Sequence, residues 1–274
     1  MVASTAAEDG WTARLLLAHP AWPAACAPGQ GWTPPVIATP REIPVDEAHR
    51  AELEAAGVTL RKPPGPGNRV LLDAATPVQR LALDFSRASG CTLMLGRDAQ
   101  LSGEVTATGA GHLLAAAGSD APVAMQLHCT FRGEQALVLL GRNLSSRRTN
   151  CLAEGPGGAI LVGDDGMISI GITIRTSDSH AIIDIGSRTQ VNLPEPVVIG
   201  PHVWLAEDVV VMKGVTIGAG AIVAARSAVT RDVAARTLVA GVPARMLREN
   251  VTWSRRARPS AAEIDALLRD LPPG

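Results

Sequence analysis

A regular six-residue pattern of apolar positions runs through the C-terminal third of the chain. In the segment VVIGPHVWLAEDVVVMKGVTIGAGAIVAARSAVTRDV an aliphatic residue returns at every sixth position, and a small or β-branched residue stands two positions before it. A period of six matches neither the 3.6-residue helix nor simple strand alternation. It predicts a parallel β-helix in which each hexad is one short strand and a turn. The aliphatic positions are Ile199, Leu205, Val211, Ile217, Val223 and Val229.

Stacked coils of such a fold pair through main-chain hydrogen bonds about 4.8 Å apart. The aliphatic residues then form an internal row, which we call the ladder. Small residues beside the ladder allow tight turns. These residues are Gly200, Ala206, Gly218 and Ala224.

The same spacing continues upstream, so we predict a β-helix domain over residues 68–248. An ordinary β-sandwich with accidental spacing is the alternative. Val162, Ile168 and Ile174 are six residues apart, with VGDDG at a turn. A weaker run consists of Leu95, Leu101, Ala107 and Leu113.

The two ends of the chain differ from the repeat region. Residues 1–67 are rich in Ala and Pro and end in RKPPGPGN, which forbids a regular helix or a central strand. Within them, only residues 45–57 have helical composition and a glycine stop. Residues 249–274 are predicted to form a helical tail that packs on the last coils or on a neighbour, because Ser260 and Glu263 have the spacing of a capping box.

A polar stretch, IRTSDSH, interrupts the ladder after Ile174. The next position in this frame is His180, and an imidazole inside an aliphatic core is costly. The clear ladder resumes at Ile199, nineteen residues later and one position out of step. Residues 181–198 are therefore predicted to be a loop excursion, and in repeat proteins such insertions often build the binding face. His180 lies at the root of that loop, where it has either a structural or a catalytic role.

Composition limits the classes of function. The chain of 274 residues is 46% apolar and 19% charged, with a formal net charge of -1, which indicates a globular protein without a global basic field. Aromatic residues make up only 3%, and tyrosine is absent, so the stacking platforms of single-strand nucleic-acid binders are missing. No apolar run approaches the length of about 20 residues that crosses a bilayer. We expect no nucleic-acid partner and no membrane insertion.

Cysteine usage and the N-terminus predict a cytoplasmic protein. The four cysteines form no C-x-x-C pair, so we expect reduced thiols and neither a zinc knuckle nor a disulfide framework. Glu8, Asp9 and the break at Pro20 make a poor signal peptide. The cysteines are Cys26, Cys91, Cys129 and Cys151.

Three segments carry a resemblance to a known family. IRTSDSH, the hexad segment from LPEPVV to TRDV, and the closing AGVPARMLREN resemble the hexapeptide-repeat acyltransferases, in particular the sugar and capsular-polysaccharide O-acetyltransferases. The resemblance covers residues 162–248 and does not extend to residues 1–150. It implies a mainly β fold, a left-handed parallel β-helix, in a homotrimer that binds acetyl-CoA along the coils between two subunits.

The resemblance also implies roles for individual residues. His180 is the general base that takes the proton from an acceptor hydroxyl, and imidazole suits this role because it titrates near neutrality. Ala206 is the favoured position for an oxyanion donor. Asp178, Asp184 or a main-chain carbonyl orients His180, and Asn150 lines the acceptor side. No Cys or Ser is placed beside His180 in a way that suggests an acyl-enzyme, so direct transfer is expected.

Acetyl-CoA binding is implied for a set of residues on and after the hexads. Trp204 occupies the position of the family's VW dipeptide, and packing on the surface is its ordinary alternative. The sequence departs from the family at Ala206, Glu207 and Arg226, where glycine is common. The full expected set is Trp204, Ala206, Ala224, Ala225, Thr230, Arg231, Arg245 and Arg248.

Other functions remain open from the sequence. An N-acetyltransferase of an amino sugar would share the base, the cofactor and the fold. A serine O-acetyltransferase usually begins with a substantial helical domain, and a bare β-helix can act as a trimeric scaffold. A γ-type carbonic anhydrase needs three zinc histidines, and His112, His128, His180 and His202 show no ligand pattern, so no metal site is expected.

Overall fold

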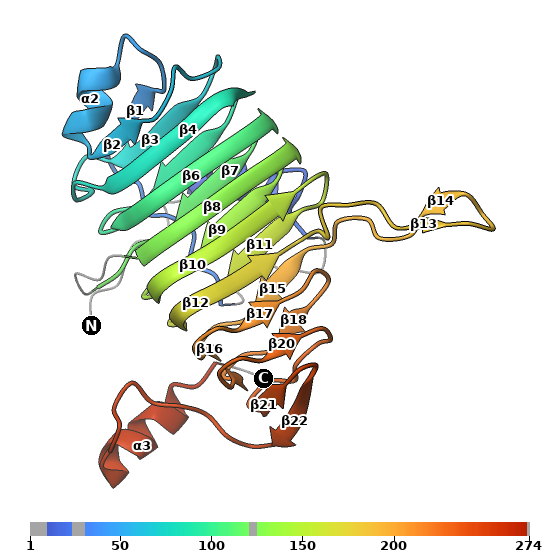
Figure 1. Ribbon diagram of the computed structural model, residues 1–274. Coiled ribbons are helices and arrows are strands. Elements are labelled where there is room, and N and C mark those ends of the chain that lie inside the picture. The colour runs from blue at the N-terminus through green and yellow to red at the C-terminus, as the bar shows by residue number, and fades with distance from the viewer. Residues whose placement is uncertain (1–9, 24–30, 121–124, 273–274) are drawn as a thin grey trace.

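The computed structural model describes residues 10–23, 31–120 and 125–272. The chain winds as a parallel β-helix whose coils stack from the end near α2 (Arg50–Ala55) to the end near α3 (Ala261–Arg269) (Figure 1). Except at the two ends of the stack, the pairings between successive coils are parallel, so strands from different coils line up in two long sheets. The mainly β fold class predicted from the hexads is thus confirmed.

One sheet consists of the short strands, in the order β1, β3, β5, β7, β9, β11, β15 and β18. We call this side of the coil side A. Only β1 (Pro40–Pro44) runs antiparallel to its neighbour, at the end of the sheet. The others are β3 (Arg69–Asp73), β5 (Thr92–Leu95), β7 (Leu113–Ala116), β9 (Leu137–Leu140), β11 (Ala159–Val162), β15 (Val197–Ile199) and β18 (Thr216–Ile217).

The second sheet contains the long strands of the upstream coils and the short strands that continue them. It begins with β2 (Val58–Leu60), which pairs with β4. The long strands are β4 (Arg80–Ser89), β6 (Leu101–Ala110), β8 (Met125–Glu134), β10 (Ser145–Glu154) and β12 (Met167–Arg175). The later strands are β16 (Trp204–Leu205), β17 (Val210–Val211), β19 (Ile222–Val223), β20 (Ala228–Val229), β21 (Leu238–Gly241) and β22 (Ala244–Arg248).

The coils differ in length along the stack, and those up to β12 contain more residues than those that follow it. Downstream, Ile199 pairs with Ile217 and Trp204 with Ile222, each 18 positions later, which is three hexads per coil. Upstream, Leu113 pairs with Leu137, 24 positions later. The upstream coils are wider because one long strand covers two sides. β12 pairs with both β16 (side B) and β17 (side C).

The ladder lies inside the coils as predicted. Its six downstream residues are at most 1% exposed, and Val162, Ile168 and Ile174 are also buried. Leu95, Leu101 and Ala107 belong to the same core. Leu113 does not, because the wider coils break the six-residue frame. Its side chain packs in a second cluster on the outer face of side A.

The N-terminal residues cover that outer face. Leu16 of α1 (Gly10–Leu17), Ala21 and Ile37 pack against alternate residues of side A. The strands of side A are therefore buried on both faces, which suits the uninterrupted apolar runs LVLL and AILV. The Asp73 carboxylate accepts the backbone N–H groups of Ala38 (2.8 Å) and Thr39 (3.0 Å) and so fastens this segment to β3.

Both predicted helices are present. α2 lies within residues 45–57 and ends before Gly57, which has a φ of +75° and lies against the Gln79 carbonyl. α3 begins with the capping box of Ser260 and Glu263, and none of its residues is buried. β1 and β2 precede residue 67 yet pair with β3 and β4, so the domain limits at residues 67 and 248 stay a prediction.

Three of the four cysteines lie in the described part of the chain, where Cys91, Cys129 and Cys151 are free and buried. Cys26 lies outside the described residues, as do Glu8 and Asp9. Burial raises the pKa of the Cys151 thiol to about 12, and burial also raises that of Cys129. A high pKa keeps these thiols protonated and unreactive.

Candidate active site

An arm of the chain, residues 177–195, leaves the stack at the coil that follows β12. Ile168 pairs with Leu205, 37 positions later, where the next coils advance by 18. The additional residues project sideways and end in a hairpin of β13 (Ile183–Asp184) and β14 (Thr189–Gln190) (Figure 1). Val197 and Val198 of the predicted excursion already belong to β15.

The root of the arm is closed by bonds between its two legs. The ladder ends at Ile174, and the next residues, Thr176 and Ser177, are buried but polar. The Thr176 hydroxyl accepts the Glu154 N–H at 2.9 Å, and the Thr176 carbonyl accepts the Glu195 N–H at 2.9 Å. The chain therefore returns to the coil within hydrogen-bonding distance of the point where it left.

His180 stands at this root and is exposed. Its carbonyl accepts the Asn192 side-chain amide at 2.8 Å. Within residues 10–23, 31–120 and 125–272, its ring makes no hydrogen bond, so the imidazole is available to a ligand. An acceptor hydroxyl could therefore reach the ring, which a general base requires.

The two predicted carboxylate partners form no hydrogen bond or ion pair with the His180 ring. Asp178 accepts the Asn192 amide at 2.9 Å and pairs with the Lys213 ammonium at 2.9 Å, and these groups hold the pKa of Asp178 below its usual range. Asp184 lies at the tip of the arm, where bonds from Ser187 lower its pKa. Asn150 is exposed on β10, in the coil before the arm, and pairs in register with Thr173.

One edge of the stack, between side C and side A, carries the arm and two further candidate residues. We define this arm edge by residues 176–196, 212–215 and 230–232. Because β12, β17 and β20 pair in succession, the turns after them stack on one another. Thr230 and Arg231 therefore lie two coils beyond the root of the arm, a distance of about 10 Å along the stack.

Four further predicted residues lie on side B. Trp204 is half-buried at the start of β16, and Ala206, Ala224 and Ala225 follow β16 and β19. The N–H of Ala206 donates to the Val223 carbonyl at 2.9 Å, and that of Ala224 to the Val239 carbonyl at 2.9 Å. Both amides are used in coil pairing, so neither is free to donate to a ligand in this structure. Ala206 cannot serve as an oxyanion donor while this bond is made.

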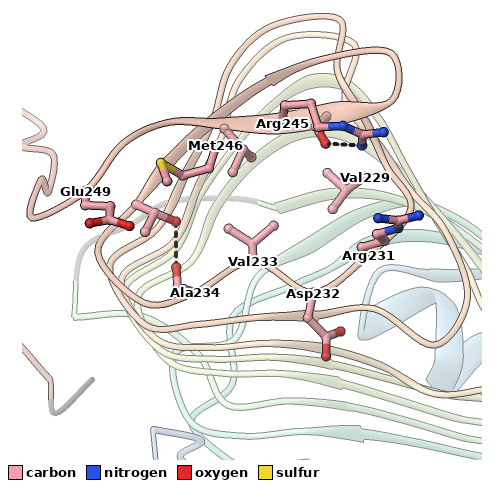
Figure 2. A pocket seen from close by; sticks show the side chains of 11 residues that line it. Val229, Arg231, Asp232, Val233, Ala234, Arg245, Met246 and Glu249 are labelled. Carbon is pink, nitrogen blue, oxygen red and sulfur yellow. Dashed lines mark hydrogen bonds between the residues drawn. The ribbon is translucent and has the colours of Figure 1, made fainter.

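A hollow of about 330 Å³ opens at the C-terminal end of the stack. Val229, the last ladder residue, and Val233 lie on its floor, and Arg231 and Arg245 lie toward one end, with Glu249 at the other (Figure 2). Arg248 is exposed on the same hairpin strand but does not line the hollow. Two guanidinium groups beside an apolar floor suit a ligand that has both phosphate and apolar parts.

Two features of this region are not predicted from the sequence. One is Lys213, whose side chain is 16% exposed and reaches Asp178 and the Leu193 carbonyl on the arm. The other is the segment after β22, where Trp253 packs beside Trp204 and the Arg255 guanidinium lies over the Trp253 ring. The rarity of lysine, with only Lys62 and Lys213 in the chain, is the one sequence signal that pointed to Lys213.

The described residues contain no group of three or more His, Cys, Asp and Glu side chains that could hold a metal ion. In the same part of the chain, no helix has the length and apolar character needed to cross a membrane.

The 18-residue coils and their buried ladder define a hexapeptide-repeat β-helix. Residues 196–231 match the family described as bacterial transferase hexapeptide (six repeats). The chain is similar to the solved structure of the polySia-specific acetyltransferase NeuO, with a TM-score of 0.60 and 20% identity over 78% of this chain and 98% of that one. Together they confirm the predicted fold class, the left-handed hexapeptide-repeat β-helix.

Curated relatives match a shorter part of the chain. A polysialic acid O-acetyltransferase of Escherichia coli O1:K1 / APEC is 36% identical over 96 residues, 35% of this chain and 31% of that protein. Galactoside O-acetyltransferase of Escherichia coli (strain K12) is 32% identical over 90 residues, 33% of this chain and 44% of that protein. The chain thus spans less than half the length of each of these relatives, 31% of the first and 44% of the second. The predicted resemblance to hexapeptide-repeat O-acetyltransferases is confirmed for this segment.

Proposed function

We propose that the protein is an acetyl-CoA-dependent O-acetyltransferase that acts on a hydroxyl group of a sugar or polysaccharide. The observation that carries the proposal is the exposed His180 at the root of an arm, on the same edge of the hexapeptide coils as Arg231. The O-acetyltransferases among the relatives support the reaction class. Because acetyl-CoA is a cytoplasmic metabolite, we place the reaction in the cytoplasm.

In the proposed reaction His180 accepts the proton of the acceptor hydroxyl while that oxygen attacks the thioester carbonyl. A new ester bond forms, the carbon–sulfur bond breaks, and His180 returns the proton to the departing thiolate. A positioned base of this kind is worth roughly 10²–10⁴-fold in rate. The proposed reaction has no acyl-enzyme, because no hydroxyl or thiol of the described residues is hydrogen-bonded to the His180 ring. Ser179, the nearest hydroxyl in sequence, donates to Glu154 at 3.2 Å instead.

The chemistry of the hollow fits the co-substrate. CoA carries phosphates, for which guanidinium groups are the preferred partners. Arg231 and Arg245 would hold these phosphates, and the apolar floor with Val229 would face the uncharged part of the ligand. When bound, acetyl-CoA supplies the activated acetyl group, and the residues of this chain orient it and move the proton.

A homotrimer with shared sites fits the placement of the candidates. His180 lies on the arm edge, whereas Trp204 and the alanines lie on side B, so one chain keeps them on different sides. The arm also exposes apolar side chains, with Ile185 93% and Leu193 61% exposed. A neighbouring copy that receives the arm would cover these side chains and bring His180 to the Trp204 side.

The experiment that tests the proposal is an assay of free-thiol release from acetyl-CoA with a panel of sugar and amino-sugar acceptors. His180→Ala should lose turnover and keep its affinity for acetyl-CoA in a calorimetric titration. His128→Ala, which removes another exposed histidine from β8, is the matched control and should stay active. An active His180→Ala protein would reject the assignment of His180 as the general base. The absence of any heat of binding with acetyl-CoA would reject the proposed acetyltransferase function.

Transfer to an amine is the second candidate. A 2,3,4,5-tetrahydropyridine-2,6-dicarboxylate N-acetyltransferase of Staphylococcus aureus (strain bovine RF122 / ET3-1) is 41% identical over 76 residues, 28% of this chain and 30% of that protein. The same base would serve both reactions. Amino-sugar acceptors in the panel distinguish them, because activity only with an amine would favour N-acetylation.

A further inference from the structure

The Asn192 side chain ties together the residues on both sides of His180. Its Nδ2 donates to Asp178 Oδ2 at 2.9 Å and to the His180 carbonyl at 2.8 Å. Its Oδ1 accepts the Ile182 N–H at 2.7 Å. Asn192 is 8% exposed, so a single buried amide from the returning leg of the arm fixes three points of the outgoing leg.

Lys213 connects this bonded group to the coil. It lies in the turn between β17 and β18, within the regular repeat. Its ammonium pairs with Asp178 Oδ2 at 2.9 Å and donates to the Leu193 carbonyl at 3.1 Å. Lys213 therefore holds both legs of the arm, one through a carboxylate and one through a backbone carbonyl. Its mostly buried side chain makes the ion pair less screened than a surface pair.

The His180 ring has no partner of its own in the described chain, so its backbone determines where the imidazole is presented. A catalytic group displaced by about 1 Å can lose about 10²-fold in rate. We propose that Lys213, Asp178 and Asn192 form a positioning chain that sets His180 relative to the coils. This inference rests on the proposed function, in which His180 is the base. In this chain of contacts Asp178 acts on the His180 backbone through the Asn192 amide, and it forms no hydrogen bond with the imidazole.

The test compares Asn192→Ala, Lys213→Met and Lys213→Arg with the parent protein. Lys62→Met is the control, because Lys62 pairs with Asp84 at a similar distance, 2.8 Å, through a more exposed side chain and far from the arm. We expect kcat to fall roughly ten- to hundredfold in Asn192→Ala and Lys213→Met. The KM for acetyl-CoA and the melting temperature should change little, Lys213→Arg should recover most of the lost kcat, and Lys62→Met should behave as the parent.

A second measurement needs no substrate. Hydrogen exchange at the Ile182 amide, which donates to Asn192, should speed up in Asn192→Ala and Lys213→Met but not in Lys62→Met. Unchanged exchange in both variants would overturn the positioning chain, whatever the activity. Faster exchange with unchanged kcat, alongside an inactive His180→Ala protein, would also overturn it. An active His180→Ala protein would instead reject the proposed function, and with it any catalytic role for the chain.

Discussion

The imidazole of His202 lies flat on the indole of Trp253, with 4.4 Å between the ring centroids and 7° between the planes. The Trp253 Nε1–H donates to the His202 carbonyl at 2.8 Å, and the Trp253 carbonyl accepts from His202 Nε2 at 3.1 Å. Asp165 bonds the other ring nitrogen at 2.7 Å. This pair fastens the segment after β22 to the coil that begins with Trp204.

Trp253→Ala should lower the free energy of unfolding by about 3 kcal/mol, because it removes a 5% exposed indole and both of its ring contacts. Chemical unfolding followed by circular dichroism measures this change. Trp253→Phe keeps the stacking and loses only the Nε1–H bond, so it should cost about 1 kcal/mol. Equal losses in the two variants would contradict the assigned role of the stack.

Acid should destabilise the protein through His112. Burial lowers the pKa of its imidazole below the ordinary 6.5. In the neutral ring Nδ1 accepts the Ala136 N–H at 3.1 Å and Nε2 donates to the Thr108 carbonyl at 3.2 Å. The unfolded chain therefore binds the proton first, and the stability present above pH 6.5 is lost as the pH falls through the lowered native pKa.

Urea unfolding between pH 8 and pH 5 tests this effect. His112→Gln should make the unfolding midpoint less dependent on pH than in the parent. The remaining dependence includes His19, because burial also lowers the pKa of its ring. His128→Gln, at an exposed position, should keep the dependence of the parent. A parent midpoint that does not fall below pH 6.5 would contradict the assignment.

The buried cysteines should resist alkylation in the folded protein. The pKa of Cys151, about 12, and the burial of Cys91 and Cys129 leave almost no accessible thiolate at pH 8. Iodoacetamide treatment followed by mass spectrometry of the three cysteine peptides should show modification only after unfolding. Rapid labelling of Cys151 in the native protein would show that the core of these coils opens.

Arg231→Ala and Arg245→Ala should each weaken acetyl-CoA binding about tenfold, because each removes a charged hydrogen-bond donor to phosphate. Calorimetric titration measures the affinity, and kcat at saturation should change little. Arg226→Ala is the control. Arg226 is strongly exposed, on the turn after β19, and its one described ion pair is a 3.7 Å contact with Asp208. An equal loss in all three variants would indicate only a general charge effect.

Mixed trimers test the shared site. His180→Ala and Trp204→Ala should each be inactive alone. When the two variants are co-expressed, sites that combine His180 of one subunit with Trp204 of another should restore part of the activity. Purification through different affinity tags on the two variants would show that the active species contains both. No recovery in such mixed assemblies would place the two residues in the same subunit.

The sequence predicts the downstream coils well because their period is regular. Each ladder position from Ile199 to Val229 is buried, and the polar break after Ile174 marks the start of the arm. The upstream coils are predicted less well, because one long strand there covers two sides of the coil and the buried apolar positions no longer recur every six residues. Leu113 shows the result, because it takes the outer face and not the ladder.

The rest of the site depends on contacts between distant residues, which no local pattern reveals. Residues 31–38 have no periodic apolar pattern that would predict their position. The apolar run LVLL of β9, however, indicates a strand that is buried on both faces, and therefore some segment that covers the outer face of side A. The ring pair of His202 and Trp253 joins positions 51 residues apart. Asn192 and Lys213 acquire their role only when the arm folds back on the coil.

Because the root of the arm is closed, the tip of the arm can change in length and sequence while the coils keep their register. The Thr176 carbonyl and the Glu195 N–H meet at 2.9 Å, so the tip of the arm, residues 183–190, can be lengthened, shortened or exchanged without a shift in the register of the coils. The strands that stack beyond the root are untouched by such an exchange. The tip of the arm is thus a replaceable module on a fixed frame, and under the proposed function an exchange of the tip would change the acceptor preference while the coils keep their register.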